Sequence, residues 1–297
     1  MILFQAFGTD AQKTLVSPAC VGLDFRDHPN TREYELYKRL HASQRELHHQ
    51  PWGLISWSFE RKTCLSVVDF ASFAARAFQE RFDCAFVNPM LANEALFSGV
   101  WECGAFHHRG MQEVAAFLER RFGAQPFRTM PRDVFALCNY FVATPAFWSA
   151  YFAFVDAALE ALEAEVVSQT PAGMAYGSKA AYLRDPNLTL RPFVIERLFS
   201  SFLIFSGARA AAFPHSKALY QKKYGELRGD FLYGLSKLRN DALRTNDAQR
   251  MRAYSVYRNL AFETQNELGT LQWLDDPPTW YDDPEVRYLL GRSSGSA

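Results

Sequence analysis

The chain carries an uncharged run that ends abruptly in charged residues, Trp52-Gly-Leu-Ile-Ser-Trp-Ser-Phe-Glu-Arg-Lys-Thr63. Residues 54–59 are of types that favour a pleated strand, with alternate side chains on opposite faces. A buried strand that delivers Arg61 and Lys62 to its carboxyl end is suited to hold a phosphate or another anionic ligand. A core strand followed by a solvated loop explains the same residues, because the loops that follow strands are commonly charged and exposed.

Composition limits the class of protein. The chain has 297 residues, of which 48% are hydrophobic, enough for a substantial core. Its formal net charge is zero, since 32 Lys and Arg balance 32 Asp and Glu, and this argues against a general nucleic-acid binder. The five cysteines form no Cys-x-x-Cys pair, which predicts free thiols in a reducing compartment rather than disulfides or zinc ligands.

The sequence also limits the expected location. Its opening residues lack the cationic start and the long apolar core of a secretory signal, and no apolar run approaches the ~18 residues needed to span a bilayer. We therefore expect a cytoplasmic protein, either free or peripheral at the inner face of the membrane.

Strand and helix patterns alternate in the first 90 residues. Strands are expected at Ile2–Phe7, Trp52–Phe59 and Cys84–Val87, and helices at Arg32–Ser43 and Ser66–Phe82. Two strand–helix–strand passages in succession predict an α/β fold with a mostly parallel sheet and flanking helices. Ligands of such sheets lie beyond the carboxyl ends of the strands. The loops of interest are therefore Gly8–Asp10, Asp24–Arg32, Glu60–Thr63 and Asn88–Asn93.

Further along the chain the helical pattern dominates. The expected elements are a helix at Met111–Phe122, a strand at Val134–Val142 and helices at Pro145–Val167 and Phe193–Phe205. After His215, residues 216–243 and 247–268 combine charged and apolar residues at helical spacing. We expect a main domain over residues 1–214, a helical appendage over 215–290 and a disordered tail over 291–297.

The appendage is basic. Between Lys217 and Arg258 there are ten Lys or Arg and four Asp or Glu, so ten minus four gives a local charge of +6. A solvated helical hairpin packed on the main domain explains this charge. Contact of residues 216–268 with an anionic membrane surface, or with a second copy in a homo-oligomer, explains it as well.

Two loops after expected strands carry polar clusters. Asp24-Phe-Arg-Asp-His-Pro-Asn30, which runs into Arg32, is either a turn with a helix cap or a contact for a nucleotide or metal. Asn88-Pro89 stands where many nucleotide-sugar enzymes place an Asp-x-Asp that holds a divalent metal. A neutral Asn is a poor ligand for a hard cation. Sugar transfer here would therefore not depend on a metal, although a Mn²⁺ or Mg²⁺ requirement stays open.

Two further clusters combine groups that could do chemistry. Trp101-Glu-Cys-Gly-Ala-Phe-His-His-Arg-Gly110 offers Glu102 as a general base or sugar ligand and His108 as a phosphate or hydroxyl ligand, against a purely structural role for both. Glu196 and Arg197 interrupt an otherwise apolar helix pattern. They are either an internal ion pair or a carboxylate aimed at an acceptor hydroxyl beside a cation aimed at phosphate.

The order of six short motifs resembles a group of bacterial proteins from capsule and O-antigen gene clusters that are treated as glycosyltransferases. The motifs are Arg32-Glu33-Tyr34-Glu35-Leu36, Trp52-Gly-Leu-Ile-Ser-Trp-Ser-Phe59, Val87-Asn88-Pro89, Trp101-Glu102-x-Gly104 with His108-x-Gly110, Cys138-Asn139-Tyr140-Phe141 and Ile195-Glu196-Arg197-Leu198-Phe199-Ser200. The resemblance covers roughly residues 1–206. It implies a GT-A-like nucleotide-diphospho-sugar fold and transfer of a hexose-type sugar to a surface polysaccharide or a lipid-linked acceptor.

The clusters and the resemblance together assign roles to individual residues. We expect Gln5, Asp24, Arg32 and Asn88 near the nucleotide. Arg61, Lys62 and Arg197 would neutralise the diphosphate. Trp57, Trp101, Glu102, His108 and Asn139 would line the sugar or the acceptor. Glu196, or else Glu102, would take the acceptor proton. The alternatives are a non-catalytic binding or assembly protein that keeps the same fold, and a helical interaction module centred on residues 216–268.

Overall fold

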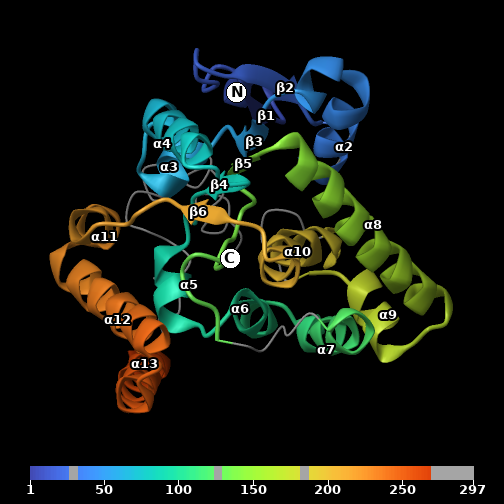
Figure 1. The fold of residues 1–297 in the computed structure, drawn as a ribbon. Coiled ribbons are helices and arrows are strands. Elements are labelled where there is room, and N and C mark those ends of the chain that lie inside the picture. The colour runs from blue at the N-terminus through green and yellow to red at the C-terminus, as the bar shows by residue number, and fades with distance from the viewer. Residues whose placement is uncertain (27–32, 124–128, 181–186, 269–297) are drawn as a thin grey trace, which may run out of the picture. The chain divides into compact units, whose positions relative to one another are not determined.

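The structure, a computed structural model, describes residues 1–26, 33–123, 129–180 and 187–268 (Figure 1). The chain divides into two compact units. The first unit comprises Met1–Met90 and Phe97–Phe213, and the second comprises Leu91–Leu96 together with the chain from Pro214 onward. The expected appendage therefore forms its unit with a short segment that lies inside the sequence of the main domain.

A six-stranded sheet organises the first unit, with strand order β2-β1-β3-β5-β4-β6. The strands are β1 Ile2–Phe7, β2 Val21–Asp24, β3 Trp52–Ser56, β4 Cys84–Phe86, β5 Phe141–Ala143 and β6 Ala210–Ala212. The pairs β1–β2, β1–β3 and β4–β6 are parallel, whereas β5 is antiparallel to both of its neighbours. The sheet is thus mixed, and the prediction of a mostly parallel sheet is corrected.

Helices cover both faces of the sheet (Figure 1). Those of the first unit are α1 Asp10–Lys13, α2 Glu33–Ser43, the 3₁₀ turn η1 Arg45–His48, α3 Phe59–Thr63, α4 Val67–Gln79, α6 Val100–His107, α7 Met111–Phe122, α8 Pro145–Val167, α9 Pro171–Gly177 and α10 Arg191–Ser206. Local sequence explains where several begin. The Ser66 hydroxyl caps α4 by accepting from the Asp69 amide at 3.0 Å, and Thr144 caps α8 directly before Pro145.

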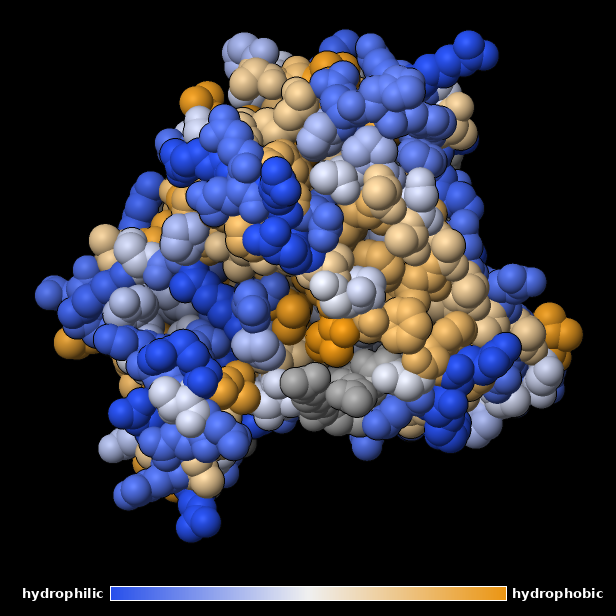
Figure 2. All heavy atoms as spheres, viewed as in Figure 1, coloured by the Kyte–Doolittle hydropathy of each residue, from blue (hydrophilic) through white to orange (hydrophobic). Residues whose placement is uncertain are grey.

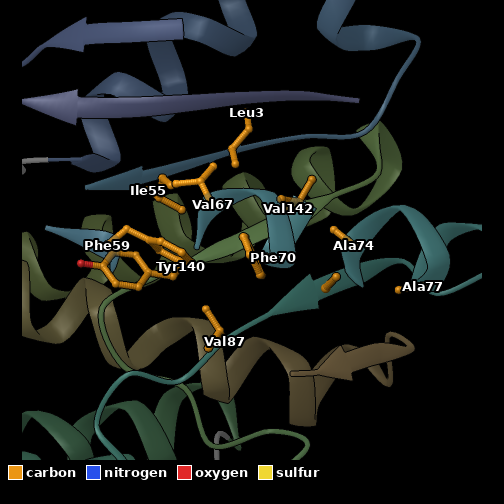
Figure 3. Close-up of a cluster of buried hydrophobic side chains, with 11 residues drawn as sticks. Leu3, Ile55, Phe59, Val67, Phe70, Ala74, Ala77, Val87, Tyr140 and Val142 are labelled. Atoms are coloured by element: carbon orange, nitrogen blue, oxygen red, sulfur yellow. The ribbon is translucent and has the colours of Figure 1, made fainter. Parts of the chain in front are cut away.

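One face of the sheet packs against α4. Its core consists of aliphatic and aromatic side chains from β1, β3 and the β5 region, which meet the apolar side of α4 (Figure 3). The labelled members are Leu3, Ile55, Phe59, Val67, Phe70, Ala74, Ala77, Val87, Tyr140 and Val142. The apolar positions of α4 recur at helical spacing, so burial of this face stabilises the helix and the sheet together.

The other face packs against α2, α8 and α10 and is mainly aromatic. The rings of Trp52 and Trp148 stack with centroids 4.1 Å apart, and the Trp148 Nε1 donates to the Trp52 carbonyl at 3.0 Å. Phe141 stacks on Phe199 of α10 at 4.2 Å. Such contacts between rings contribute to the stability of the fold beyond what the burial of their surface area contributes. They use much of the large phenylalanine content of this chain.

Two expected strands are shorter in the structure than predicted. Strand β3 ends at Ser56 rather than Phe59, and the chain turns directly into the one-turn helix α3. The strand expected over Val134–Val142 is confined to Phe141–Ala143, because Cys138 and Asn139 adopt left-handed backbone conformations that a strand does not allow. Most of the Trp101–Gly110 cluster lies on helix α6, which covers Val100–His107.

All of the regular secondary structure in the described part of the second unit is helical. It contains α5 Leu91–Leu96, α11 Lys217–Tyr224, α12 Glu226–Thr245 and α13 Ala248–Leu268. Every residue of α5 is buried, and its backbone is tied to the other helices by tyrosines. The Ala92 amide donates to the Tyr224 hydroxyl at 3.0 Å, and the Tyr254 hydroxyl donates to the Ala95 carbonyl at 3.1 Å.

None of the helices in the described part of the chain combines the length and the apolar character that crossing a membrane requires.

Candidate functional site

Several chain segments meet at one edge of the sheet. Because β5 is antiparallel to its neighbours, it begins where β3 and β4 end, with Phe141 opposite Leu54 and Phe86. Residues 138–140 therefore lie at the same edge as residues 56–58 and as Asn88. The chain leaves β1 toward β2 on one side and returns as β3 on the other, so the strand order reverses at β1. In open α/β sheets, ligands bind outside the carboxyl ends of the strands at such a reversal.

Buried hydroxyl groups connect β3 to the segment before β5. The Ser56 Oγ lies 2.5 Å from the Tyr140 hydroxyl and 2.9 Å from the Ser58 Oγ. Gln5 supports this group from β1, because its Nε2 donates to the Ser56 carbonyl at 3.2 Å and its Oε1 accepts from the Ser17 amide at 2.7 Å. Burial raises the pKa of Tyr140, which therefore stays protonated and can donate a hydrogen bond.

Two cations from α3 lie beside this network. The Lys62 Nζ is 5.9 Å from the centre of the Tyr140 ring and 4.0 Å from the Cys138 Sγ. The Arg61 guanidinium lies 4.7 Å from the centre of the Trp57 ring, a cation–π distance. Trp57 is itself fixed by its amide, which donates to the Ala6 carbonyl at 2.7 Å. The two cations predicted from the sequence thus lie at the edge of the sheet, on a helical turn rather than on a loop.

The turn at Cys138 and Asn139 is held in an unusual conformation from two sides. Its residues have φ angles of 67° and 49°, and such left-handed conformations cost about 1–2 kcal/mol for residues with a side chain. The Glu196 Oε1 accepts from the Cys138 amide at 2.6 Å, and the Tyr37 hydroxyl donates to the Asn139 carbonyl at 3.0 Å. The Asn139 Oδ1 is buried and accepts no hydrogen bond from the described residues. It is an acceptor suited to a ligand hydroxyl.

Arg197 and Trp101 are packed inside the first unit. The Arg197 side chain is 4% exposed, and it donates to the Val100 and Phe193 carbonyls at 3.0 and 2.7 Å. The Trp101 indole is fully buried and donates to the Ser201 hydroxyl at 2.8 Å. These contacts link α6 to α10. They leave no open face for a diphosphate at Arg197 or for a sugar at Trp101, which argues against the ligand-binding roles that we predicted for both.

Glu102 and His108 also have structural surroundings. The Glu102 Oε2 accepts from the amide and from the hydroxyl of Ser98, both at 2.5 Å, and so helps to define the start of α6. The His108 ring lies 4.1 Å from the Phe193 ring. Burial, and then the nearby Arg197, lower the pKa of His108 to about 3, so its imidazole is neutral at physiological pH and is not a cation for phosphate.

The remaining predicted residues lie at strand ends or outside the described part of the chain. Asp24, at the end of β2, binds the Arg26 guanidinium through both carboxylate oxygens, and this hydrogen bonding lowers the pKa of its carboxyl group. The Asn88 Oδ1 accepts from the Met90 amide at 3.1 Å and forms the turn after β4. Arg32 lies outside the described residues. Within the described ranges, no three His, Cys, Asp or Glu side chains gather as a metal site would require.

Sequence reasoning missed the hydroxyl network as part of the candidate site. Ser56 and Tyr140 are 84 positions apart in the chain, so only their shared place at the edge of the sheet brings them together. A local signal was present. Polar Ser56 and Ser58 directly follow buried apolar residues, and Cys138-Asn139-Tyr140 interrupts another apolar run.

Comparison of the chain with protein-family models, with curated proteins and with solved structures gives no match.

Proposed function

We propose that the chain is a glycosyltransferase with a GT-A-like fold that binds a nucleotide-diphospho-sugar beyond the carboxyl ends of β1 and β3. The observation that carries this proposal is the reversal of strand order at β1 with Lys62 beside the same edge. A cation fixed next to buried hydroxyl groups is suited to balance a diphosphate, because both kinds of group stabilise oxygen anions.

In this proposal the edge supplies three kinds of contact. Lys62 binds the diphosphate, and the cation–π pair of Trp57 and Arg61 offers an aromatic and cationic surface to the nucleotide or sugar. The Asn139 Oδ1 accepts from a sugar hydroxyl. Glu196 is a positioning residue for Asn139, since its carboxylate holds the preceding amide in place.

The transfer step is a displacement at the anomeric carbon of the donor sugar. A bond forms between that carbon and the acceptor hydroxyl oxygen, the bond to the diphosphate oxygen breaks, and its electron pair leaves with the nucleoside diphosphate. The acceptor proton goes to a general base. The Glu196 Oε2, which forms an ion pair with the Arg197 Nη1 at 3.4 Å, is the carboxylate oxygen we assign to this role, because the other oxygen is held more closely by the Cys138 amide at 2.6 Å and the side chain keeps 23% exposure. The acceptor is a glycan or a lipid-linked sugar.

Calorimetric titration of the full chain tests the binding part of the proposal. We would titrate UDP-, GDP- and dTDP-linked sugars with and without Mn²⁺. For the sugar that binds, Lys62→Ala is expected to weaken affinity about tenfold to hundredfold, since a hydrogen bond to a charged group contributes about 1.5–3 kcal/mol.

The matched control is Lys179→Ala, an exposed lysine of the first unit that binds the Asn187 side chain at 3.2 Å and lies between α9 and α10. The Lys179→Ala variant should bind the nucleotide sugar with the same affinity as the parent. If no nucleotide sugar binds under either condition, or if Lys62→Ala binds as tightly as the parent, the proposed site is wrong.

A second function, a non-catalytic nucleotide-sugar binding or assembly protein, is favoured by one observation. Both carboxylates predicted to act as bases, Glu102 and Glu196, accept short hydrogen bonds from backbone amides. Measuring release of nucleoside diphosphate in the presence of glycan acceptors separates the two functions. Binding that depends on Lys62 without release of diphosphate would favour the binding protein.

A further inference from the structure

A thiol and an amine lie side by side at the edge of the sheet. The Lys62 Nζ, from α3, is 4.0 Å from the Cys138 Sγ, from the turn before β5. These residues, which we call the Cys138–Lys62 pair, are 76 positions apart in the chain, so only the fold brings them together. Both residues are half-buried, and the surface over α3 and α4 is largely hydrophilic on the face drawn in Figure 2, which suits the approach of small polar molecules.

Both members of the pair are held in place by other residues. The Glu196 carboxylate accepts from the Cys138 amide at 2.6 Å, and the φ angle of Cys138 is 67°. Lys62 is part of the helical turn α3, where its amide donates to the Ser58 carbonyl at 2.9 Å, and its Nζ lies 5.9 Å from the centre of the Tyr140 ring. The approach of sulfur and nitrogen therefore follows from the backbone of two segments, and not from two exposed side chains that meet at the surface.

The other four cysteines have different surroundings. Cys84 and Cys103 are buried. Burial, and then the Glu60 carboxylate, raise the pKa of Cys20 to about 12, so its thiol stays protonated and unreactive. The Cys64 Sγ lies 4.0 Å from the Arg61 carbonyl oxygen. At Cys138, by contrast, the neighbour is an ammonium group, and a positive charge beside a sulfur favours the nucleophilic thiolate form.

We propose that the Cys138–Lys62 pair is a modification site at which a peroxide joins the sulfur to the amine nitrogen as a sulfenamide. The Cys138 thiolate attacks one oxygen of hydrogen peroxide, so that an S–O bond forms, the O–O bond breaks, and the departing hydroxide takes up a proton to become water. In this step the sulfur is oxidised to a sulfenic acid and the peroxide is reduced. The Lys62 amine, after it gives up the extra proton of its ammonium form, attacks the same sulfur. An S–N bond forms, the S–O bond breaks, and the hydroxyl group leaves with an amine proton as a second water.

The modification regulates the donor site, a consequence that rests on the proposed function, in which Lys62 binds the diphosphate. A sulfenamide nitrogen carries no fixed charge, so the joined side chain no longer offers a cation to the diphosphate. The nitrogen is also tied to Cys138 and cannot follow a ligand. A dithiol reductant reverses the change, because one of its thiolates attacks the sulfur and releases the amine, and its second thiolate then releases the Cys138 thiol.

Peptide mass spectrometry of the full chain tests for the modification. The reduced protein is treated with hydrogen peroxide and digested without reductant. We expect the peptide that contains Lys62 to be joined to the peptide that contains Cys138. The product should weigh about 2 Da less than the sum of the two peptides, because two hydrogens are lost, and dithiothreitol should separate it.

Three variants identify the reacting groups. Cys138→Ser removes the sulfur, and Lys62→Arg keeps the positive charge but replaces the amine by a guanidinium, which is a poor nucleophile. Both should abolish the joined peptide. Cys64→Ser is the matched control, because Cys64 is a half-buried cysteine only two positions from Lys62, and this variant should form as much product as the parent.

Calorimetric titration separates this inference from the proposed function. Peroxide should weaken the affinity of the parent for a nucleotide sugar by about tenfold or more, as expected for Lys62→Ala, and dithiothreitol should restore it. The affinity of Cys138→Ser should be the same before and after peroxide. A joined peptide in a chain that binds no nucleotide sugar would support the modification site and overturn the proposed function. If the parent forms no joined peptide, or if Cys64→Ser abolishes it, the inference is wrong whether or not a nucleotide sugar binds.

Discussion

At the scale of single residues, His108 shows how burial fixes a protonation state. Its ring is packed against Phe193 and lies near the Arg197 guanidinium, so a second positive charge there would be desolvated and repelled. The neutral ring fills space between α6 and α10 without needing a counter-ion. We predicted from the sequence that His108 binds a phosphate or a hydroxyl group, because the His-His-Arg-Gly pattern does not show whether the side chain is buried.

The depressed pKa of His108 predicts a loss of stability in acid. Well above pH 6.5 the histidine is neutral in both the folded and the unfolded state. As the pH falls from 6.5 toward about 3, the unfolded state gains a proton that the folded state does not, so the free energy of unfolding declines. The slope from this group is at most about 1.4 kcal/mol per pH unit.

Urea unfolding at a series of pH values measures this slope. The variant His108→Gln should show a shallower decline between pH 6.5 and pH 4 than the parent, whatever its stability at neutral pH. His49→Gln, which changes an exposed histidine, is the control and should keep the parent slope. Equal slopes for His108→Gln and the parent would contradict a neutral buried imidazole.

At the scale of elements, the junction of β3 with β5 depends on one glycine. Gly53 lies opposite Val142, and a methyl group at Gly53 would overlap the Phe141 carbonyl oxygen and lie 2.9 Å from the Val142 Cα. These neighbours are backbone atoms, so relief requires the two strands to separate. Since β5 begins directly after the Cys138–Asn139 turn, the same junction also places the candidate site.

Gly53→Ala is therefore expected to destabilise the chain by about 3 kcal/mol or more, at the upper end of the usual cost of overpacking. Gly177→Ala is the matched control, because a methyl group there would meet no atom within 4 Å. Its stability should be unchanged or slightly higher. Thermal and denaturant unfolding of both variants check the comparison, and similar stability for the two would show that β3 and β5 tolerate separation.

The elements also show what the sequence can predict. Strand β1 and helices α7 and α8 have the predicted bounds, because their periodicity and, for α8, a Thr144 cap before Pro145 are local signals. Strand β3 was predicted too long, since Trp57–Phe59 continues its alternation while the chain already turns. No periodic pattern distinguishes a parallel from an antiparallel strand, so the direction of β5 was not predictable. Arg61 and Lys62 could be predicted as part of the candidate site because they directly follow one strand in the sequence. The hydrogen bond between Ser56 and Tyr140 could not, because only the tertiary fold brings these two residues together.

At the scale of the whole molecule, the second unit is built around a carboxylate from an inserted helix. Glu94 of α5 is fully buried, and its Oε1 accepts from the Ser236 hydroxyl at 3.0 Å. The Arg239 Nη2 lies 3.7 Å from the same oxygen, and the His215 Nδ1 lies 3.6 Å from the Oε2. A buried charge with one partner removed costs about 3–5 kcal/mol, so this network holds α5 to α12 strongly.

This arrangement predicts how the chain responds to truncation. A chain that ends at Phe213 keeps α5 but lacks the helices that cover it, so Glu94 loses its partners and the apolar side chains of α5 become exposed. We expect the truncated chain to aggregate, as measured by light scattering and size-exclusion chromatography. Replacing Leu91 and Leu96 by Lys in the truncated chain should restore solubility, because these leucines are then surface residues. A monodisperse truncated chain that melts at the temperature of the parent would mean that α5 belongs to the first unit.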